Sequence, residues 1–266
     1  MPTTSDSNGT GWDHTLALRC EGVAKSYHLG QELSLQHTLN SIVRRAEDHE
    51  RFWAVSDATF DVTRGEFFGI VGANGSGKST LTQLISGIAM PDKGRIDVWG
   101  RVVPLLEVGA GFHPELTGRE NVSLFGTILG LDTSAIRAEM DRIADFAGVR
   151  RHMETPLKRY SSGMQARLSF ATAVCFPADI YVFDEVLAVV DDSFRERCSE
   201  ELVRLNQSGK TIIFMSHDLD LVRSVCSTGM WLDRGAVRAR GAIDEVAAGY
   251  SDRPPASADS PAATQA

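Results

Sequence analysis

The sequence predicts an α/β fold built on a parallel-rich sheet, and three observations support this prediction. Short apolar segments alternate with segments of helical periodicity along most of the chain, a pattern that favours parallel strands joined by helices. The stretch from Gly72 to Thr80 fits G-x-x-x-x-G-K-[ST] at every fixed position, between an expected strand and an expected helix. With 266 residues, 42% hydrophobic and 23% charged, the chain suits one large domain or one domain with an inserted subdomain.

Composition excludes several classes of protein. No apolar stretch approaches the roughly 18 to 20 residues that cross a bilayer, and the polar N-terminus lacks the pattern of a signal peptide, so a membrane role is expected to require a partner. The formal net charge of -8 argues against a general nucleic-acid binder. The four cysteines are far apart, which predicts reduced thiols in a cytosolic protein and neither a zinc site nor a disulfide framework. They are Cys20, Cys175, Cys198 and Cys226.

The N-terminal part is expected to begin with a disordered leader over residues 1–13. Strands are expected over residues 16–23 and 58–62 of a domain that spans residues 14–250. Between these strands, residues 31–50 show the spacing of an amphipathic helix, which looks like an insertion. Its apolar positions are Leu35, Leu39, Ile42, Val43 and Ala46.

The remaining elements follow the Gly72 to Thr80 stretch in a regular order. A helical subdomain is expected over about 115–177, and a tail rich in Pro, Ala, Ser and Asp over 251–266 is expected to be disordered. Strands are expected over 95–99, 102–108, 180–185, 211–215, 229–233 and 236–240. Helices are expected over 120–129, 134–147, 194–206 and 244–250, and a further helical run is expected to end near residue 174.

The glycine-rich stretch has the chemistry of a phosphate-binding loop, as in P-loop NTPases. Its residues are Gly72, Ala73, Asn74, Gly75, Ser76, Gly77, Lys78, Ser79 and Thr80. Gly75 and Gly77 allow the backbone N–H groups to point inward as an anion nest. Lys78 brings a positive charge to the β- and γ-phosphates, and the Ser79 hydroxyl can ligate Mg²⁺. A plain glycine turn before a helix is the weaker alternative, so the chain is predicted to bind a nucleoside triphosphate.

Two further segments place polar groups at strand ends. Asp184 and Glu185 end an apolar strand, where Asp184 would hold Mg²⁺ and Glu185 would act as general base on the attacking water. The alternative is a solvated acidic strand end. His217 ends another strand and could donate to the γ-phosphate, although a lone histidine is more often structural. Tyr27 could equally be a buried strand aromatic or a platform for adenine.

A third motif consists of Ser161, Ser162, Gly163 and Met164, just before a helical apolar run. In isolation it is a capped helix start, and such a start can also bind a phosphate. Because it belongs to the helical subdomain, it is not expected to reach the phosphate loop of its own chain.

Together these motifs resemble an ABC transporter ATP-binding subunit of the polysaccharide export branch, which serves O-antigen, teichoic acid or mycobacterial galactan. The branch is indicated by residues Leu105 to Asn121, Tyr160 to Met164 and Asp184 to Val189. The similarity covers residues 16–250. It implies an ABC ATPase fold with an N-terminal antiparallel β portion, an inserted helical subdomain, and ATP and Mg²⁺ as cofactors.

The resemblance also implies a homodimer in which each ATP lies between one chain's phosphate loop and residues Ser161 to Met164 of the other. It implies that Tyr27 stacks on adenine and that Glu185 activates the attacking water. It also implies that His217 contacts the γ-phosphate and that Asp191 lies in the contact between the two ATP sites. It implies a separate transmembrane permease subunit at the cytoplasmic face of the membrane, a gating role for residues 31–50, and a lipid-linked polysaccharide as indirect substrate. A transporter of lipids, drugs or small solutes, or a soluble ABC ATPase, remains the alternative.

Three departures from the family pattern stand out. The usual glutamine that contacts Mg²⁺ has no clear counterpart, and Glu107 or a neighbour occupies that region. Asp191 follows Val190, where glycine is commoner. The chain is expected to lack the C-terminal carbohydrate-binding domain of some relatives, and so not to recognise the glycan's end itself.

Overall fold

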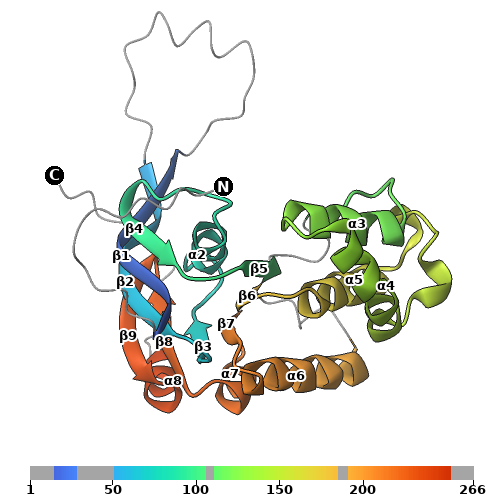
Figure 1. Ribbon diagram of the computed structural model, residues 1–266. Coiled ribbons are helices and arrows are strands. Elements are labelled where there is room, and N and C mark those ends of the chain that lie inside the picture. Colours follow the sequence, from blue (N-terminus) through green and yellow to red (C-terminus); the bar gives the residue numbers. More distant parts are fainter. Residues whose placement is uncertain (1–14, 29–50, 106–110, 185–190, 253–266) are drawn as a thin grey trace, which may run out of the picture.

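A six-stranded sheet forms the centre of the molecule. Figure 1 shows a computed structural model that describes residues 15–28, 51–105, 111–184 and 191–252. The first five strands of the sheet are parallel, and the last is antiparallel to its neighbour. In order across the sheet they are β5 (Val102–Leu105), β6 (Ile180–Asp184), β7 (Thr211–Ser216), β3 (Phe67–Val71), β8 (Thr228–Asp233) and β9 (Ala236–Ala242). The predicted parallel-rich sheet is therefore confirmed.

A second, antiparallel sheet is made of β2 (Arg51–Thr63), β1 (Leu16–His28) and β4 (Lys93–Val98), in this order. The predicted strands over 16–23 and 58–62 are shorter than β1 and β2. Irregular pairing explains the difference, because the register shifts several times and Gly22 and Asp57 have positive φ values of 58° and 51°. Such bulges interrupt the alternation of apolar and polar residues by which a strand is predicted.

Helix α2 (Lys78–Ile85) lies between the two sheets. Its residues Leu81, Leu84 and Ile85 are buried in one apolar cluster with residues of both sheets. In β3 all five residues are buried, and successive side chains enter different clusters, Phe68 on the α2 side and Phe67 on the other. The segment before α2 is therefore held by packing on both sides.

The helical subdomain stands apart from the antiparallel sheet (Figure 1). It contains α3 (Gly118–Ile128), α4 (Thr133–Ala147), two short turns, η1 (Arg150–His152) and η2 (Leu157–Arg159), and α5 (Ser162–Cys175). Helix α6 (Asp192–Gln207) runs beneath both the subdomain and the sheet, and α7 (Leu219–Val225) and α8 (Ile243–Ser251) follow near the C-terminal end. Helix α7 was not predicted, because seven residues are too few to show a helical period.

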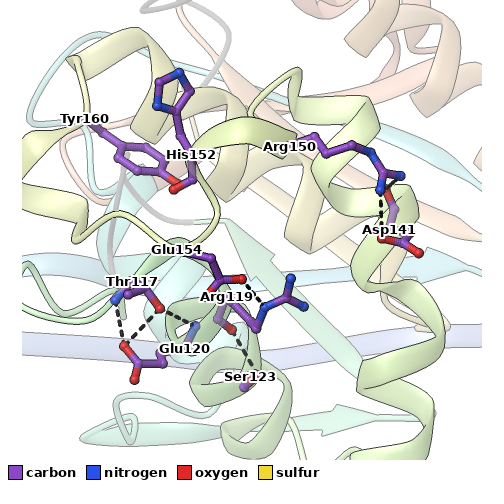
Figure 2. A network of polar contacts seen from close by, with 9 residues as sticks. All are labelled: Thr117, Arg119, Glu120, Ser123, Asp141, Arg150, His152, Glu154 and Tyr160. Atoms are coloured by element: carbon purple, nitrogen blue, oxygen red, sulfur yellow. Dashed lines mark hydrogen bonds and ion pairs between the residues drawn. The ribbon is translucent and has the colours of Figure 1, made fainter.

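Polar contacts fix the segment that leads into α5 (Figure 2). Thr117 and Glu120 form a reciprocal capping box at the start of α3. The neighbouring Arg119 donates to Glu154 at 2.7 Å. The Tyr160 hydroxyl donates to the backbone carbonyl of His152 at 2.7 Å. These bonds hold the turn region between α4 and α5 against the start of α3.

The four cysteines are free and buried, as expected for reduced thiols. Burial raises the pKa of Cys175 to about 12, so this thiol stays protonated and unreactive. The predicted disorder over 251–266 is wrong at its first residue, because α8 continues to Ser251. Several other predictions concern residues outside the described part of the chain: the leader, the helix over 31–50, the tail over 253–266, Glu107 and Glu185. Within the described part, no helix has both the length and the apolar character needed to span a bilayer.

Candidate functional site

The phosphate loop follows β3, and glycines are required where its backbone passes close to other strands. Gly77 adopts a φ of 105°, and a Cβ added there would lie 2.2 Å from the carbonyl oxygen of Ala54. A Cβ at Gly72 would lie 2.4 Å from the carbonyl oxygen of Leu232. Both contacts are far below van der Waals distance, so side chains at these positions would push the loop out of place.

Two polar side chains of the loop point toward its inner side. Lys78 is buried, and its Nζ donates to the carbonyl oxygens of Gly72 at 2.8 Å and Ala73 at 3.1 Å. The Ser76 hydroxyl is buried with no hydrogen-bond partner among the described residues. A buried donor without a partner is unusual and costly. Ser76 is thus a loop hydroxyl that the described residues leave without an acceptor.

A pocket of ≈ 360 Å³ opens over this loop. Its lining residues are Phe52, Ala54, Asn74, Gly75, Gly77, Lys78, Ser79 and Thr80. Phe52 is an aromatic residue that the sequence analysis missed. It pairs across the antiparallel sheet with Tyr27, and both side chains are exposed, at 45% and 42%. Residues directly opposite on paired strands share one face, so Phe52 and Tyr27 form an aromatic edge beside the loop.

The carboxyl ends of three adjacent parallel strands bring the phosphate loop, His217 and Asp184 to one edge of the sheet. Strand β7 lies between β3, which leads into the loop, and β6, which ends at Asp184. Val71 pairs with Ser216, and Asp184 pairs with Met215, so His217 emerges between the loop and Asp184. The Thr82 hydroxyl, in the middle of α2, also contacts the Met215 sulfur at 2.9 Å, which places α2 beside the end of β7.

The residues present fit a magnesium ion carried by a nucleotide. Ser79 lines the pocket, and Asp184 is a mostly buried carboxylate at the same edge of the sheet. Among the described residues no group of three or more His, Cys, Asp or Glu could hold a metal by itself. Mg²⁺ is commonly bound by one or two protein oxygens plus substrate phosphates, so a hydroxyl and a carboxylate suit it.

The third motif lies on another part of the molecule. Ser161 caps α5, its hydroxyl accepting from the Met164 N–H at 3.2 Å, and both Ser161 and Ser162 are exposed. None of residues 161–164 lines the pocket over the loop. Asp191 caps α6, and hydrogen bonds from the Ser193 hydroxyl, the Phe194 N–H and Arg167 lower the pKa of its carboxyl to about 2.

Comparison with known proteins agrees with this geometry. The family model described as ABC transporter matches residues 55–188. The ABC transporter protein AbcA of Aeromonas salmonicida is 42% identical over 235 residues, covering 88% of this chain and 75% of the relative. The chain belongs to the ABC transporter family. Its predicted resemblance to the polysaccharide export branch is also confirmed by the names of other relatives.

The O-antigen export system ATP-binding protein RfbB of Klebsiella pneumoniae is 35% identical over 236 residues, 85% of this chain and 96% of the relative. The teichoic acids export ATP-binding protein TagH of Bacillus cereus (strain ZK / E33L) is 39% identical over 233 residues. That match covers 88% of this chain and 42% of TagH, so the chain spans less than half of this ABC transporter relative.

Among solved structures, a dimeric ATP-binding cassette in a post-hydrolysis state with ADP and Pi is similar, with a TM-score of 0.70. The match covers 85% of this chain and 98% of that one at 21% identity. The predicted ABC ATPase fold is therefore confirmed, including the antiparallel β portion and the helical subdomain.

Proposed function

We propose that this chain is the ATP-hydrolysing subunit of an ABC transporter that exports a lipid-linked polysaccharide, such as O-antigen, teichoic acid or galactan. One observation carries the enzymatic part of the proposal: the phosphate loop, Asp184 and His217 lie at the carboxyl ends of three adjacent strands. Ligands of open α/β sheets bind at this edge.

The residues at this edge divide the chemistry of phosphoryl transfer to water. The loop N–H groups and Lys78 hold the β- and γ-phosphates, while Ser79 and Asp184 hold Mg²⁺, with Glu107 as a further candidate ligand. The ion, when bound, neutralises charge on the phosphate oxygens. Glu185, next to Asp184 in the sequence, takes a proton from the attacking water. His217 donates to the γ-phosphate and keeps it in line with that water.

A second copy of the chain completes the site. The exposure of Ser161 and Ser162, and the absence of residues 161–164 from the pocket lining, support a role for this segment in binding the ATP of a partner chain. Asp191 belongs to the contact between the two sites. Tyr27 stacks on adenine, and Phe52 extends the same aromatic edge toward the loop.

A mixture of two inactive variants tests the composite site. Lys78→Ala chains and Ser161→Arg chains should each be inactive as homodimers, whereas their mixture should recover ATPase activity, because one site of each mixed dimer keeps both intact halves. The measurement is phosphate release at matched total protein. As a control, a Lys78→Ala/Ser161→Arg chain mixed with Ser161→Arg should recover none. Mixed dimers that form but stay inactive would contradict the shared site.

The names of the relatives support the substrate and partner. RfbB and TagH are named for O-antigen and teichoic acid export, so we expect a separate transmembrane permease and location at the cytoplasmic face of the membrane. Depleting the chain in its cell should cause a lipid-linked saccharide to accumulate, and its capture from membranes should retrieve a permease. Mass spectrometry identifies both. Accumulation of a lipid or small solute instead would favour the alternative transporter class. If no compound accumulates and no permease is captured, a soluble ATPase is favoured.

A further inference from the structure

Tyr27 lies at the end of β1, beyond the point to which β4 pairs with that strand. Strand β1 lies between β2 and β4, but in the described part of the chain β4 pairs with it only over residues 18–24. Residues 25–28 pair with β2 on the other side. A strand edge presents backbone N–H and C=O groups that no neighbouring strand satisfies. Another group must therefore hold this end of β1 on the β4 side.

The Asp92 carboxylate supplies those contacts. Asp92 directly precedes β4, and its own N–H donates to the Ala24 carbonyl oxygen at 2.8 Å. Its Oδ2 accepts from the backbone N–H and from the hydroxyl of Ser26, both at 2.8 Å. Its Oδ1 accepts from the Lys25 Nζ at 2.8 Å. The hydrogen bonds from Lys25 and Ser26 hold the pKa of the Asp92 carboxyl well below its usual range, so the carboxylate stays charged.

The same contacts reach the Tyr27 ring in two ways. Ser26 directly precedes Tyr27, so fixing its backbone N–H restricts the backbone that carries the ring. The Lys25 Nζ, held by Asp92, lies over the Tyr27 ring at 5.8 Å from its centroid, within the range of a cation–π contact. Tyr27 lies opposite Phe52, which lines the pocket over the phosphate loop. Asp92 thus restrains both the backbone and the ring of a residue beside that pocket.

We propose that Asp92 is a positioning residue for the nucleotide base: by holding Lys25 and Ser26 it orients Tyr27 beside the phosphate-loop pocket. This inference rests on the proposed ATPase function, in which Tyr27 stacks on adenine, and adds a residue to it. Asp92 does not line the pocket over the loop. Its loss should therefore weaken binding of the base and leave binding and hydrolysis of the phosphates unchanged.

A purely stabilising role for Asp92 predicts a different outcome, and the same sheet offers a matched comparison. The Arg19 Nε donates to Asp61 of β2 at 2.9 Å, and the side chains of Asp61 and Asp92 are 37% and 36% exposed. Asp61 lies toward the opposite end of β2 from Phe52. Ion pairs this exposed contribute little to folding stability. If both carboxylates only stabilise the sheet, removing either one should have the same effect on ATP binding.

The experiment separates the base from the phosphates with inorganic tripolyphosphate, which can bind the loop but has no base. Calorimetry on the full-length chain, with EDTA to prevent turnover, measures Kd for ATP and for tripolyphosphate. Stacking of a base on an aromatic side chain contributes about 5- to 140-fold to affinity. Asp92→Ala misorients the ring without removing it, so it should raise Kd for ATP by about 3- to 10-fold. Its Kd for tripolyphosphate and its kcat for ATP should match those of the wild type.

Three further variants test the route of the effect. Asp61→Ala should bind both ligands as the wild type does, although it also loses one ion pair of the antiparallel sheet. Tyr27→Ala should weaken ATP binding more than Asp92→Ala, and the double variant should be no weaker than Tyr27→Ala, because Asp92 acts through Tyr27. Asp92→Asn keeps one of the two acceptor oxygens and should raise Kd for ATP less than Asp92→Ala.

A wild-type Kd for ATP in Asp92→Ala, an equal rise in its Kd for tripolyphosphate, or an equal loss in Asp61→Ala would overturn the proposal. Additive losses in the double variant, or a wild-type Kd for ATP in Tyr27→Ala, would also overturn it. If Asp92→Ala does not fold, Asp92→Asn decides, and a wild-type Kd for ATP there overturns the proposal. A wild-type chain that binds neither ligand would instead reject the proposed ATPase function, and this inference with it.

Discussion

Replacing Glu185 by glutamine should reduce ATP turnover by a factor of about 10² to 10⁴, the usual contribution of a general base. Glutamine has the same shape but cannot accept the proton of the attacking water. ATP affinity should stay near that of the wild type, because the loop and Lys78 bind the phosphates. The variant should therefore accumulate as an ATP-bound dimer. Single-turnover hydrolysis and size-exclusion chromatography with ATP measure the two effects.

A surface carboxylate provides the control for Glu185. Glu154 pairs with Arg119 on the helical subdomain, and Glu154→Gln makes the same chemical change away from the loop (Figure 2). It should keep wild-type turnover. Hydrolysis by Glu185→Gln within tenfold of the wild type would remove Glu185 from the role of base and leave Asp184 or His217 to be tested for it.

Replacing Gly77 by alanine should abolish nucleotide binding at micromolar ATP. The residue has a φ of 105°, and its new Cβ would lie 2.2 Å from the Ala54 carbonyl oxygen, so the backbone must move. Moving the loop removes N–H groups from the phosphates. Each hydrogen bond to a charged group contributes about 1.5 to 3 kcal/mol, so losing two weakens binding about 10²-fold or more. Isothermal titration calorimetry measures the change in Kd.

The matched control is Gly75, which also has a positive φ, of 77°, but has no atom within 4 Å of an added Cβ. Gly75→Ala bears only the backbone strain of about 1 to 2 kcal/mol. It should bind ATP more weakly than the wild type but measurably. Equal losses in the two variants would show that strain, and not the contact with Ala54, makes glycine necessary at position 77.

Much of the site could be predicted from sequence because each piece is local. The phosphate loop is nine consecutive residues, and Asp184 and His217 each end an apolar strand. Parallel strands bring their carboxyl ends to one edge, so three separate segments could be placed together without a structure. The helical elements of the subdomain were also predictable, since α3 and α4 have clear apolar periodicity and α3 starts with a capping box.

The parts that could not be predicted depend on residues far apart in the chain. Phe52 enters the pocket because β2 begins earlier than its alternation suggests, and bulges near Asp57 hide that extension. The contact between Arg167 and Asp191 depends on how α5 packs on α6. Pairings of this kind follow from tertiary packing, and sequence spacing alone does not specify them.

The position of β3 in the sheet has a consequence for the order of folding. Both neighbours of β3 come from the C-terminal third of the chain, since Phe67 pairs with Ile212 and Phe68 with Thr228. The antiparallel sheet, by contrast, is complete once residue 98 has been made. During synthesis the ribosome therefore releases the Phe67–Val71 strand, five apolar or small residues, long before its partners exist. The nascent chain must keep this strand from aggregating, and the nucleotide site is among the last features to form.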